Sequence, residues 1–193
     1  MKDLEKELKL LSSKLSKLQK EGKIKGYSLI GALAVSAHAR PRATKDIDFL
    51  VSADKDFFFK LFPEILKKKG YSLKVFKGEI GDPVKGLIRI YDKEDKTELA
   101  DIIPVLWNWQ DEIVENAEKI ELLGISIPVA RLEDLIVLKL KAGGPQDILD
   151  TEELLKTAKI SKKADFERLN SLAKRAGVSK KLQTLSLKLG IHI

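Results

Sequence analysis

Residues 27–51, with the sequence YSLIGALAVSAHARPRATKDIDFLV, constrain the fold more than any other stretch of the chain. A short apolar run ends at Gly31, a segment of small residues follows, and Pro41 stops it, which predicts a strand, a short helix and a turn. Polar and apolar residues then alternate, which predicts a second strand from Lys45 to Val51. The side-chain period of two places the polar residues of this alternation on one face, namely Arg42, Thr44, Asp46 and Asp48.

Two carboxylates on one strand face, those of Asp46 and Asp48, repel each other unless a positive charge lies between them. A divalent cation such as Mg²⁺ prefers carboxylate oxygens and removes this repulsion. A D-x-D pair is common on solvated surfaces, but this one begins an apolar strand, where an unpaired carboxylate is costly. A third acid, Asp101, lies in another apolar run at residues 98–105. Such a trio fits a two-metal phosphoryl-transfer site, with Asp101 as a ligand of the catalytic ion.

The composition excludes several classes of function. The 193 residues contain no cysteine, which removes disulfides, thiolate nucleophiles and cysteine-ligated zinc, and the two histidines are too few for a multi-histidine metal site. The net charge of +7 permits an RNA or nucleotide partner without requiring one. The chain lacks an apolar run of membrane-spanning length and starts with mixed charges, so we expect a cytoplasmic protein with no membrane partner. The P-loop, G-x-S-x-G and G-x-G-x-x-G motifs are absent.

The periodicity predicts an α+β protein in three parts. Residues 1–22 form an amphipathic helix whose leucine stripe we expect to pack on the core. Residues 23–130 form that core, a mixed β-sheet flanked by helices, with a hairpin around Gly124. Residues 131–193 show helical signals to the end and form a helical C-terminal region.

The order G-A…R-x-T-x-D-I-D…L-A-D-I resembles the nucleotidyltransferase fold of the DNA polymerase β superfamily, and most of all its minimal AbiEii-type toxin group. The likeness covers roughly residues 27–150. It implies a nucleotidyltransferase-like sheet, two Mg²⁺ ions, and three acids that are both catalytic residues and metal ligands, namely Asp46, Asp48 and Asp101. Gly31 and Ala32 stand where the superfamily usually has Gly-Gly or Gly-Ser, so nucleotide binding there would depend on backbone N–H groups at the helix start.

The helical part adds candidate nucleotide-binding residues. Asp134 and Lys139 are five residues apart on a predicted helix, and Asp147 and Asp150 follow a GGP turn. The resemblance implies that Lys139 contacts the triphosphate and that Asp147 orients Lys139 or the base. The alternatives are an exposed helix lysine and an acid favoured by the positive end of a helix.

Other polar and aromatic residues have two interpretations each. Arg42 and Thr44 contact the nucleotide phosphates or the acceptor, or Arg42 only neutralises the acids. His38 is expected to pack or cap rather than to catalyse. Trp107 and Trp109 stack on a base or belong to the core.

Together the patterns and the resemblance predict a Mg²⁺-dependent nucleotidyltransferase, which moves a nucleoside monophosphate from a nucleoside triphosphate to an acceptor hydroxyl. The resemblance implies a tRNA 3′ end, a protein or a small molecule as the acceptor. It also implies a toxin with a cognate antitoxin as one biological role. The alternative is a catalytically inactive relative that binds a nucleotide, an RNA or a partner protein.

Overall fold

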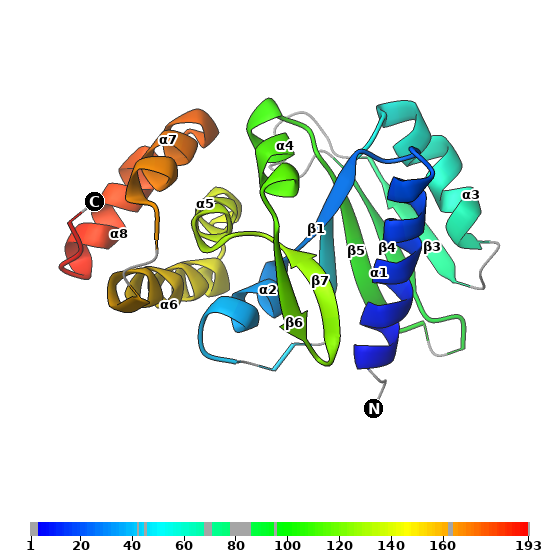
Figure 1. Ribbon diagram of the computed structural model, residues 1–193, viewed down its shortest axis with the longest axis horizontal. Helices are drawn as coiled ribbons and strands as arrows, with labels where there is room; N and C mark the ends of the chain where they lie inside the picture. The colour runs from blue at the N-terminus through cyan, green and yellow to red at the C-terminus, as the bar shows by residue number, and fades with distance from the viewer. Residues whose placement is uncertain are drawn as a thin grey trace.

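The computed structural model describes residues 4–41, 43–44, 46–67, 71–77, 86–94, 96–161 and 164–192. Its strands form one sheet in the order β3-β4-β5-β2-β1-β7-β6 (Figure 1). The strands are β1 (Gly26–Ile30), β2 (Ile47–Ser52), β3 (Ser72–Phe76), β4 (Leu87–Tyr91), β5 (Glu98–Pro104), β6 (Glu118–Leu122) and β7 (Ile125–Val129). β2 runs parallel to β5 and β1 runs parallel to β7, while the other neighbours are antiparallel. The sheet is therefore mixed, as predicted.

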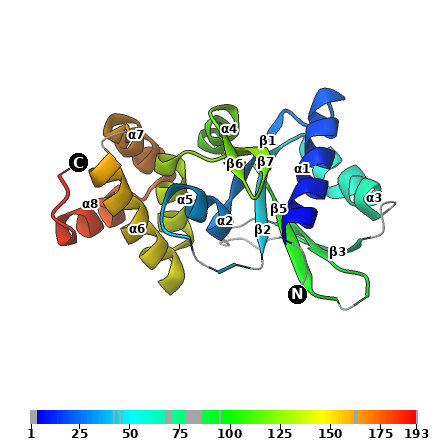
Figure 2. The same cartoon turned by 60° about the horizontal axis from the view of Figure 1, so that its bottom comes forward.

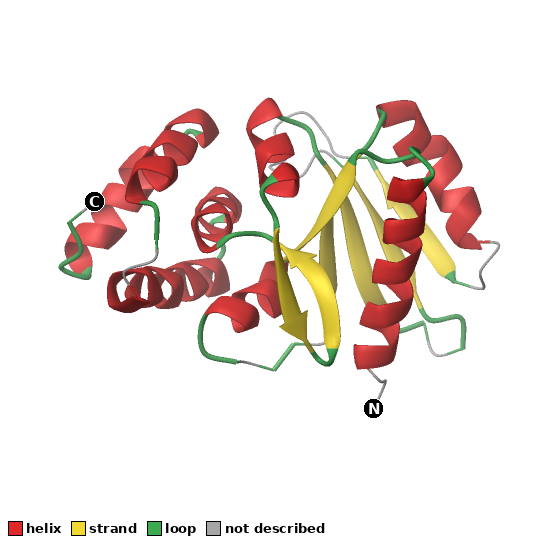
Figure 3. Ribbon diagram, viewed as in Figure 1, coloured by secondary structure: helices red, strands yellow, loops and turns green. Residues whose placement is uncertain are grey.

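Helices flank this sheet and continue beyond it, which confirms the predicted α+β class (Figure 3). They are α1 (Leu4–Lys20), α2 (Gly31–His38), α3 (Phe62–Lys67, preceded by a π-helical turn at Phe57–Leu61), α4 (Asn108–Glu115), α5 (Leu132–Ala142), α6 (Pro145–Ser161), α7 (Phe166–Ala176) and α8 (Ser179–Lys188). α1 and α3 lie over the same face of the sheet, α1 against β1 and α3 against β3 (Figure 2). α5 to α8 gather at the opposite end of the molecule. Among the described helices, none is both long and apolar enough to cross a membrane.

The leucine stripe of α1 faces the sheet. Leu8, Leu11, Leu15 and Leu18 are at most 5% exposed. Full burial of one such side chain contributes roughly 1.5–3 kcal/mol, so the stripe is enough to hold α1 in place. Two residues after the end of the helix lies Gly22, whose φ of +68° is the left-handed conformation that glycine adopts without strain.

Helix α5 connects the sheet to the C-terminal helices. Its residues Leu135, Ile136, Val137 and Leu140 are 0% exposed because α2, α6 and α7 all pack around it. A helix that is apolar on most sides has to be enclosed, and this enclosure fixes the position of α5 between the sheet and the C-terminal helices.

The start of β2 differs from the prediction. The strand begins at Ile47, which pairs with Ala100, rather than at Lys45, which lies outside the described residues. Thr44 and Asp46 therefore precede the strand, and the predicted start of the strand at Lys45 is too early. The hydroxyl of Thr44 accepts a hydrogen bond from the Asp46 backbone N–H at 3.3 Å, a local turn that competes with strand pairing.

Candidate active site

A row of side chains crosses one face of the sheet. In-register pairs join Ile30 to Asp48, Asp48 to Asp101, and Asp101 to Arg89, on the strands β1, β2, β5 and β4. Side chains at one register position point to the same face, so the two carboxylates and the guanidinium are neighbours. Phe49, the next residue of β2, points to the opposite face and is 0% exposed in the core. The sheet thus separates an apolar face from a charged one.

Gly31 allows the Asp48 carboxylate to lie against the start of α2. The φ of Gly31 is +69°, which other residues rarely adopt, and a Cβ atom there would lie 1.9 Å from Oδ2 of Asp48. Both the backbone conformation and the space therefore require glycine. The predicted glycine turn has a second use, because it makes room for the acid on the neighbouring strand.

The Asp48 carboxylate is poorly compensated. Burial is the main cause that raises its pKa to about 7, and the carboxylates of Asp101 and Asp46 add to this shift. Lys139 and Arg89 act in the other direction. Within the described part of the chain, the Asp48 carboxylate forms no hydrogen bond or ion pair. It is an acid that a cation would strongly stabilise in its ionised form.

Asp101, in contrast, is held by Arg89. Nε and an Nη atom of Arg89 donate to the two oxygens of Asp101 at 2.8 and 2.9 Å, a bidentate pair. The other Nη atom donates to Glu98 at 2.9 Å. Hydrogen bonds to Asp101 are the largest cause that raises the pKa of Arg89, so the guanidinium stays charged.

Lys139 of α5 lies between two acids of α6. Its Nζ atom is 2.9 Å from Oδ1 of Asp147 and 2.8 Å from Oδ2 of Asp150. Burial lowers the pKa of Lys139, but the hydrogen bonds to Asp150 and Asp147 outweigh burial, so the pKa is raised overall. Oδ2 of Asp147 also accepts from the backbone N–H of Gly144, which fixes the turn between the two helices. Lys139 is therefore a positioned and permanently charged cation.

A cavity of about 260 Å³ opens between the sheet and the C-terminal helices. Its polar side is formed by Gly31, Asp48, Lys139 and Asp147. The remaining lining residues are mostly apolar, and they are Ile30, Leu50, Ile103, Leu106, Trp107, Trp109, Gln110, Leu138, Lys141 and Ala142. Such a cavity suits a ligand with one anionic end and one flat, apolar end.

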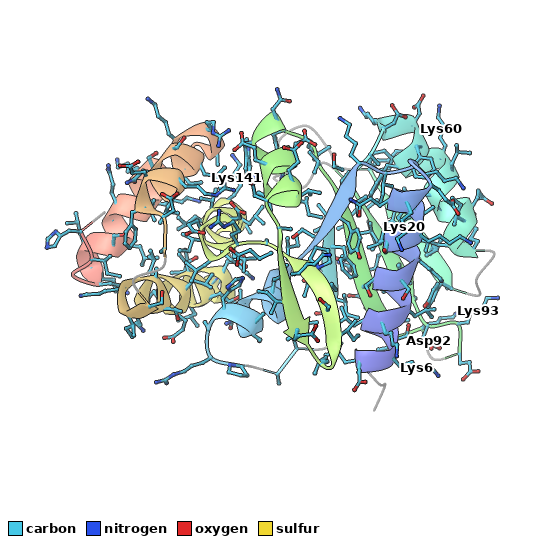
Figure 4. All side chains as sticks on the ribbon, viewed as in Figure 1. Lys6, Lys20, Lys60, Asp92, Lys93 and Lys141 are labelled. Atoms are coloured by element: carbon cyan, nitrogen blue, oxygen red, sulfur yellow. The ribbon has the colours of Figure 1, made fainter. Side chains whose placement is uncertain are left out.

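The two tryptophans form one wall of this cavity. Their rings are nearly parallel, at 14°, with centroids 6.1 Å apart. Nζ of Lys141 lies 5.7 Å from the centroid of Trp107 and donates to the carbonyl of Ala176 in α7. Figure 4 labels Lys141 between α4 and the C-terminal helices, where it joins this wall to α7.

Several predicted site residues lie around this cavity and others do not. Asp46 and Thr44 are in the segment before β2, and Asp46 is exposed. Ala32 is buried in α2 and is not part of the lining. Arg42 lies outside the described residues. His38 makes a hydrogen bond of 2.8 Å between Nε2 and the carbonyl of Ala130, as expected of a packing residue.

Sequence reasoning gave no role to Asp150, did not find Arg89 and misplaced one acid. Asp150 is 3% exposed and holds Lys139, and its spacing of three from Asp147 on one helix could have indicated this. Arg89 had no such signal, because its contact with Asp101 depends on strand register. Asp134 does not accompany Lys139 but pairs with Arg168 of α7 at 2.7 Å.

The chemistry of the acids fits a divalent cation, although no group of three His, Asp or Glu side chains in the described residues is arranged to hold a metal ion. Asp48 and Asp101 are in register on adjacent strands and offer the hard oxygen donors that Mg²⁺ prefers. The Asp48 carboxylate lacks a partner among the described residues. These two residues are therefore the ones that fit a cation best, with Asp46 close enough to raise the pKa of Asp48.

Comparisons with known proteins identify a family for this chain. A family model described as nucleotidyl transferase of unknown function (DUF2204) matches residues 7–184. No curated protein sequence matches the chain.

Solved structures share the fold. The antibiotic-resistance factor ANT(2'')-Ia is 18% identical with a TM-score of 0.50, over 93% of this chain and 95% of that chain. An antigenic nucleotidyltransferase-like protein from Paracoccidioides brasiliensis is 16% identical with a TM-score of 0.52, over 97% and 94%. A structure of ANT(2'')-Ia in complex with adenylyl-2''-tobramycin is 18% identical with a TM-score of 0.50, over 90% of this chain and 97% of that chain. At such identities the likeness shows the nucleotidyltransferase-like fold.

Proposed function

This chain belongs to the family described as nucleotidyl transferase of unknown function (DUF2204), and we propose that it moves a nucleoside monophosphate from a nucleoside triphosphate to an acceptor hydroxyl, with release of pyrophosphate. One observation carries the proposal. The under-compensated carboxylate of Asp48 and the fixed ammonium of Lys139 line the same cavity, which supports neighbouring sites for a cation and for phosphates. Phosphoryl transfer needs this combination of positioning and charge neutralisation.

The proposed nucleotide site uses the polar side of the cavity. Lys139 binds the triphosphate, and Asp147 and Asp150 hold its ammonium in position. The backbone N–H groups of Gly31 and Ala32, at the positive end of α2, face the phosphates. Thr44 and Arg42, in the segment before β2, are further proposed phosphate or acceptor contacts. The tryptophan wall receives the base.

The proposed metal ligands are Asp48 and Asp101, together with Asp46. Two Mg²⁺ ions, when bound, supply neutralisation of the triphosphate and activation of the attacking hydroxyl. The chain itself supplies the fixed positions of its ligands, because the in-register pairing of β2 with β5 sets the relation between Asp48 and Asp101. In this proposal residues 23–130 carry the acids and residues 131–193 carry the lysine, so the site needs both parts.

The acceptor is proposed by class. The ANT(2'')-Ia complex contains adenylyl-2''-tobramycin, which supports a small-molecule hydroxyl as the first class to test. The sequence motifs of the AbiEii-type group support a tRNA 3′ end or a protein hydroxyl, and with them a toxin that has an antitoxin partner.

A binding protein without catalysis is the second candidate function. Arg89 engages both oxygens of Asp101, which favours a site where the third acid is permanently neutralised. Such a protein would bind a nucleotide in the cavity, and an RNA or a partner protein elsewhere, and would transfer nothing.

Label transfer separates the two candidates. The protein is incubated with each α-³²P-labelled nucleoside triphosphate, Mg²⁺, and in turn total RNA, a protein extract and a set of aminoglycosides. We expect a labelled acceptor with the natural chain, and a loss on the order of 10³-fold in Asp48→Asn. Asp56→Asn, which changes an acid that is exposed and paired with Lys60, is the matched control and should retain transfer. Nucleotide binding without transfer to any acceptor would favour the binding protein.

A further inference from the structure

Arg89 occupies an unusual position for a residue beside a cation site. Its guanidinium covers both oxygens of Asp101, the acid in register with Asp48. The Arg89 side chain is 28% exposed and that of Asp101 is 18% exposed, so water screens this pair only in part. A metal ion that binds Asp101 is therefore repelled by the guanidinium of Arg89 at short distance.

We propose that Arg89 is the counter-ion of Asp101 when no metal is bound, that a divalent cation competes with it for this carboxylate, and that Glu98 retains the guanidinium when Asp101 is released. The inference rests on the proposed function, because it takes Asp48 and Asp101 to be cation ligands. It assigns to Arg89 and Glu98 the control of cation affinity, as positioning residues that do not touch the substrate.

The in-register pairing gives the physical reason for the first part. Two carboxylates at one register position of adjacent strands, here Asp48 and Asp101, repel each other. Arg89 counteracts this repulsion through its bidentate contact with Asp101. The same positive charge opposes a divalent cation and occupies the oxygens that it would use. Arg89 therefore lowers the affinity of the site for divalent cations.

The contacts of Glu98 give the reason for the second part. Glu98 binds one Nη atom of Arg89, whereas Asp101 binds Nε and the other Nη atom, so the two acids do not share a donor. The Glu98 side chain is 48% exposed, and it lies at the start of β5. The Arg89 guanidinium also lies 5.5 Å from the centroid of the Phe76 ring. Arg89 thus keeps an acid and an aromatic contact after its bonds to Asp101 break.

A titration with Mn²⁺ tests this without turnover. Free Mn²⁺ is measured by electron paramagnetic resonance in the full chain, without nucleotide. We expect Arg89→Gln to tighten Mn²⁺ binding about tenfold and Glu98→Gln to weaken it about threefold. The double variant should bind as Arg89→Gln does, because Glu98 acts only through Arg89. Arg131→Gln, which removes an arginine paired with Glu118, controls for the change in net charge and should leave the affinity unchanged.

The outcomes separate the two proposals. Weaker or unchanged Mn²⁺ binding in Arg89→Gln overturns the inference, since it would mean that Arg89 only orients Asp101. If Glu98→Gln changes the Mn²⁺ affinity equally in the natural chain and in the Arg89→Gln variant, Glu98 does not act through Arg89 and its proposed role is overturned. Should Arg89→Gln not fold, Arg89→Lys keeps a charge but loses the bidentate contact, and about threefold tighter binding is then required. A natural chain that binds no Mn²⁺, or binds it equally after Asp48→Asn, overturns the proposed metal site itself.

Discussion

Two acids inside this protein, Asp48 and Asp134, differ in what surrounds them. Burial raises the pKa of both, that of Asp48 to about 7 and that of Asp134 to about 6. Asp134 of α5 is 0% exposed and forms an ion pair with Arg168 of α7, at 2.7 Å. Asp48 has no such partner among the described residues, because the cations near it are held by other acids. A buried acid with its own arginine joins two helices, whereas one left without a partner is available for a ligand.

Removal of the partner of Asp134 should have the largest effect on stability. Arg168→Met leaves a fully buried carboxylate without compensation, and we expect a loss of about 3 kcal/mol in the free energy of unfolding, measured by urea denaturation. Arg175→Met breaks the ion pair between Arg175 and Glu112, which are 40% and 37% exposed. It should lower the free energy of unfolding by less than about 1 kcal/mol. Equal losses would contradict the structural role of Asp134.

Removal of the cation nearest the proposed phosphate site should affect ligand binding. Lys139→Met should weaken nucleoside triphosphate binding about 30-fold, or about 2 kcal/mol, because the variant lacks the buried ammonium that binds the phosphates. Equilibrium dialysis with a labelled nucleotide measures this change. Lys156→Met, on an exposed ion pair with Glu153, is the control. An unchanged dissociation constant for Lys139→Met would remove Lys139 from the nucleotide site.

The pKa of Asp48 predicts a stability that depends on pH. The folded pKa of about 7 lies above the unfolded value, so between the two values the folded state holds a proton that the unfolded state lacks. Stability contributed by this group is therefore present at low pH and is lost as the pH rises through about 7. Without divalent cations, Asp48→Asn should be more stable than the natural chain by about 2 kcal/mol near pH 8 and by much less near pH 5. Urea denaturation in a chelating buffer measures both, and a gain that is equal at the two pH values would rule out this cause.

The smallest expected effect concerns the tryptophan wall. The chain has two tryptophans, and both line the cavity, so intrinsic fluorescence reports on its occupancy. Nucleotide binding should quench this fluorescence, and Trp107→Leu should weaken binding about threefold, since a stacked base loses its platform. Trp109, at 7% exposed, belongs more to the core, so Trp109→Phe should change the affinity less. Quenching that survives unchanged in Trp107→Leu would place the base elsewhere.

The order of the elements could be predicted from the sequence because periodicity is local. A short stretch of sequence was enough to predict the helix α1 from its leucine stripe, the turn at Gly31, and the strand β5 from its apolar run. The mixed sheet followed from this order together with the resemblance to a known fold. The resemblance predicts that Asp147 orients either Lys139 or the base, and the ion pair between Lys139 and Asp147 agrees with the first interpretation.

The contacts between distant residues could not be predicted in the same way. The pairing of Arg89 with Asp101 depends on the register of β4 against β5, which no local pattern specifies. The start of β2 was placed too early because alternation continued into a segment that lacks a partner strand. Asp134 was grouped with Lys139 by sequence spacing, although Arg168, far along the chain, is its partner.

The charged row across the sheet has a consequence for folding. A slip of one residue between β2 and β5 would turn all the side chains of one strand to the other face. Asp101 would then enter the apolar layer that Ile102 occupies, where an unpaired carboxylate costs several kcal/mol, and Arg89 would lose its partner. A sheet with a shifted register between β2 and β5 is therefore less stable than the native sheet. The acids that equip this face for chemistry also ensure that the chain assembles its strands in only one alignment.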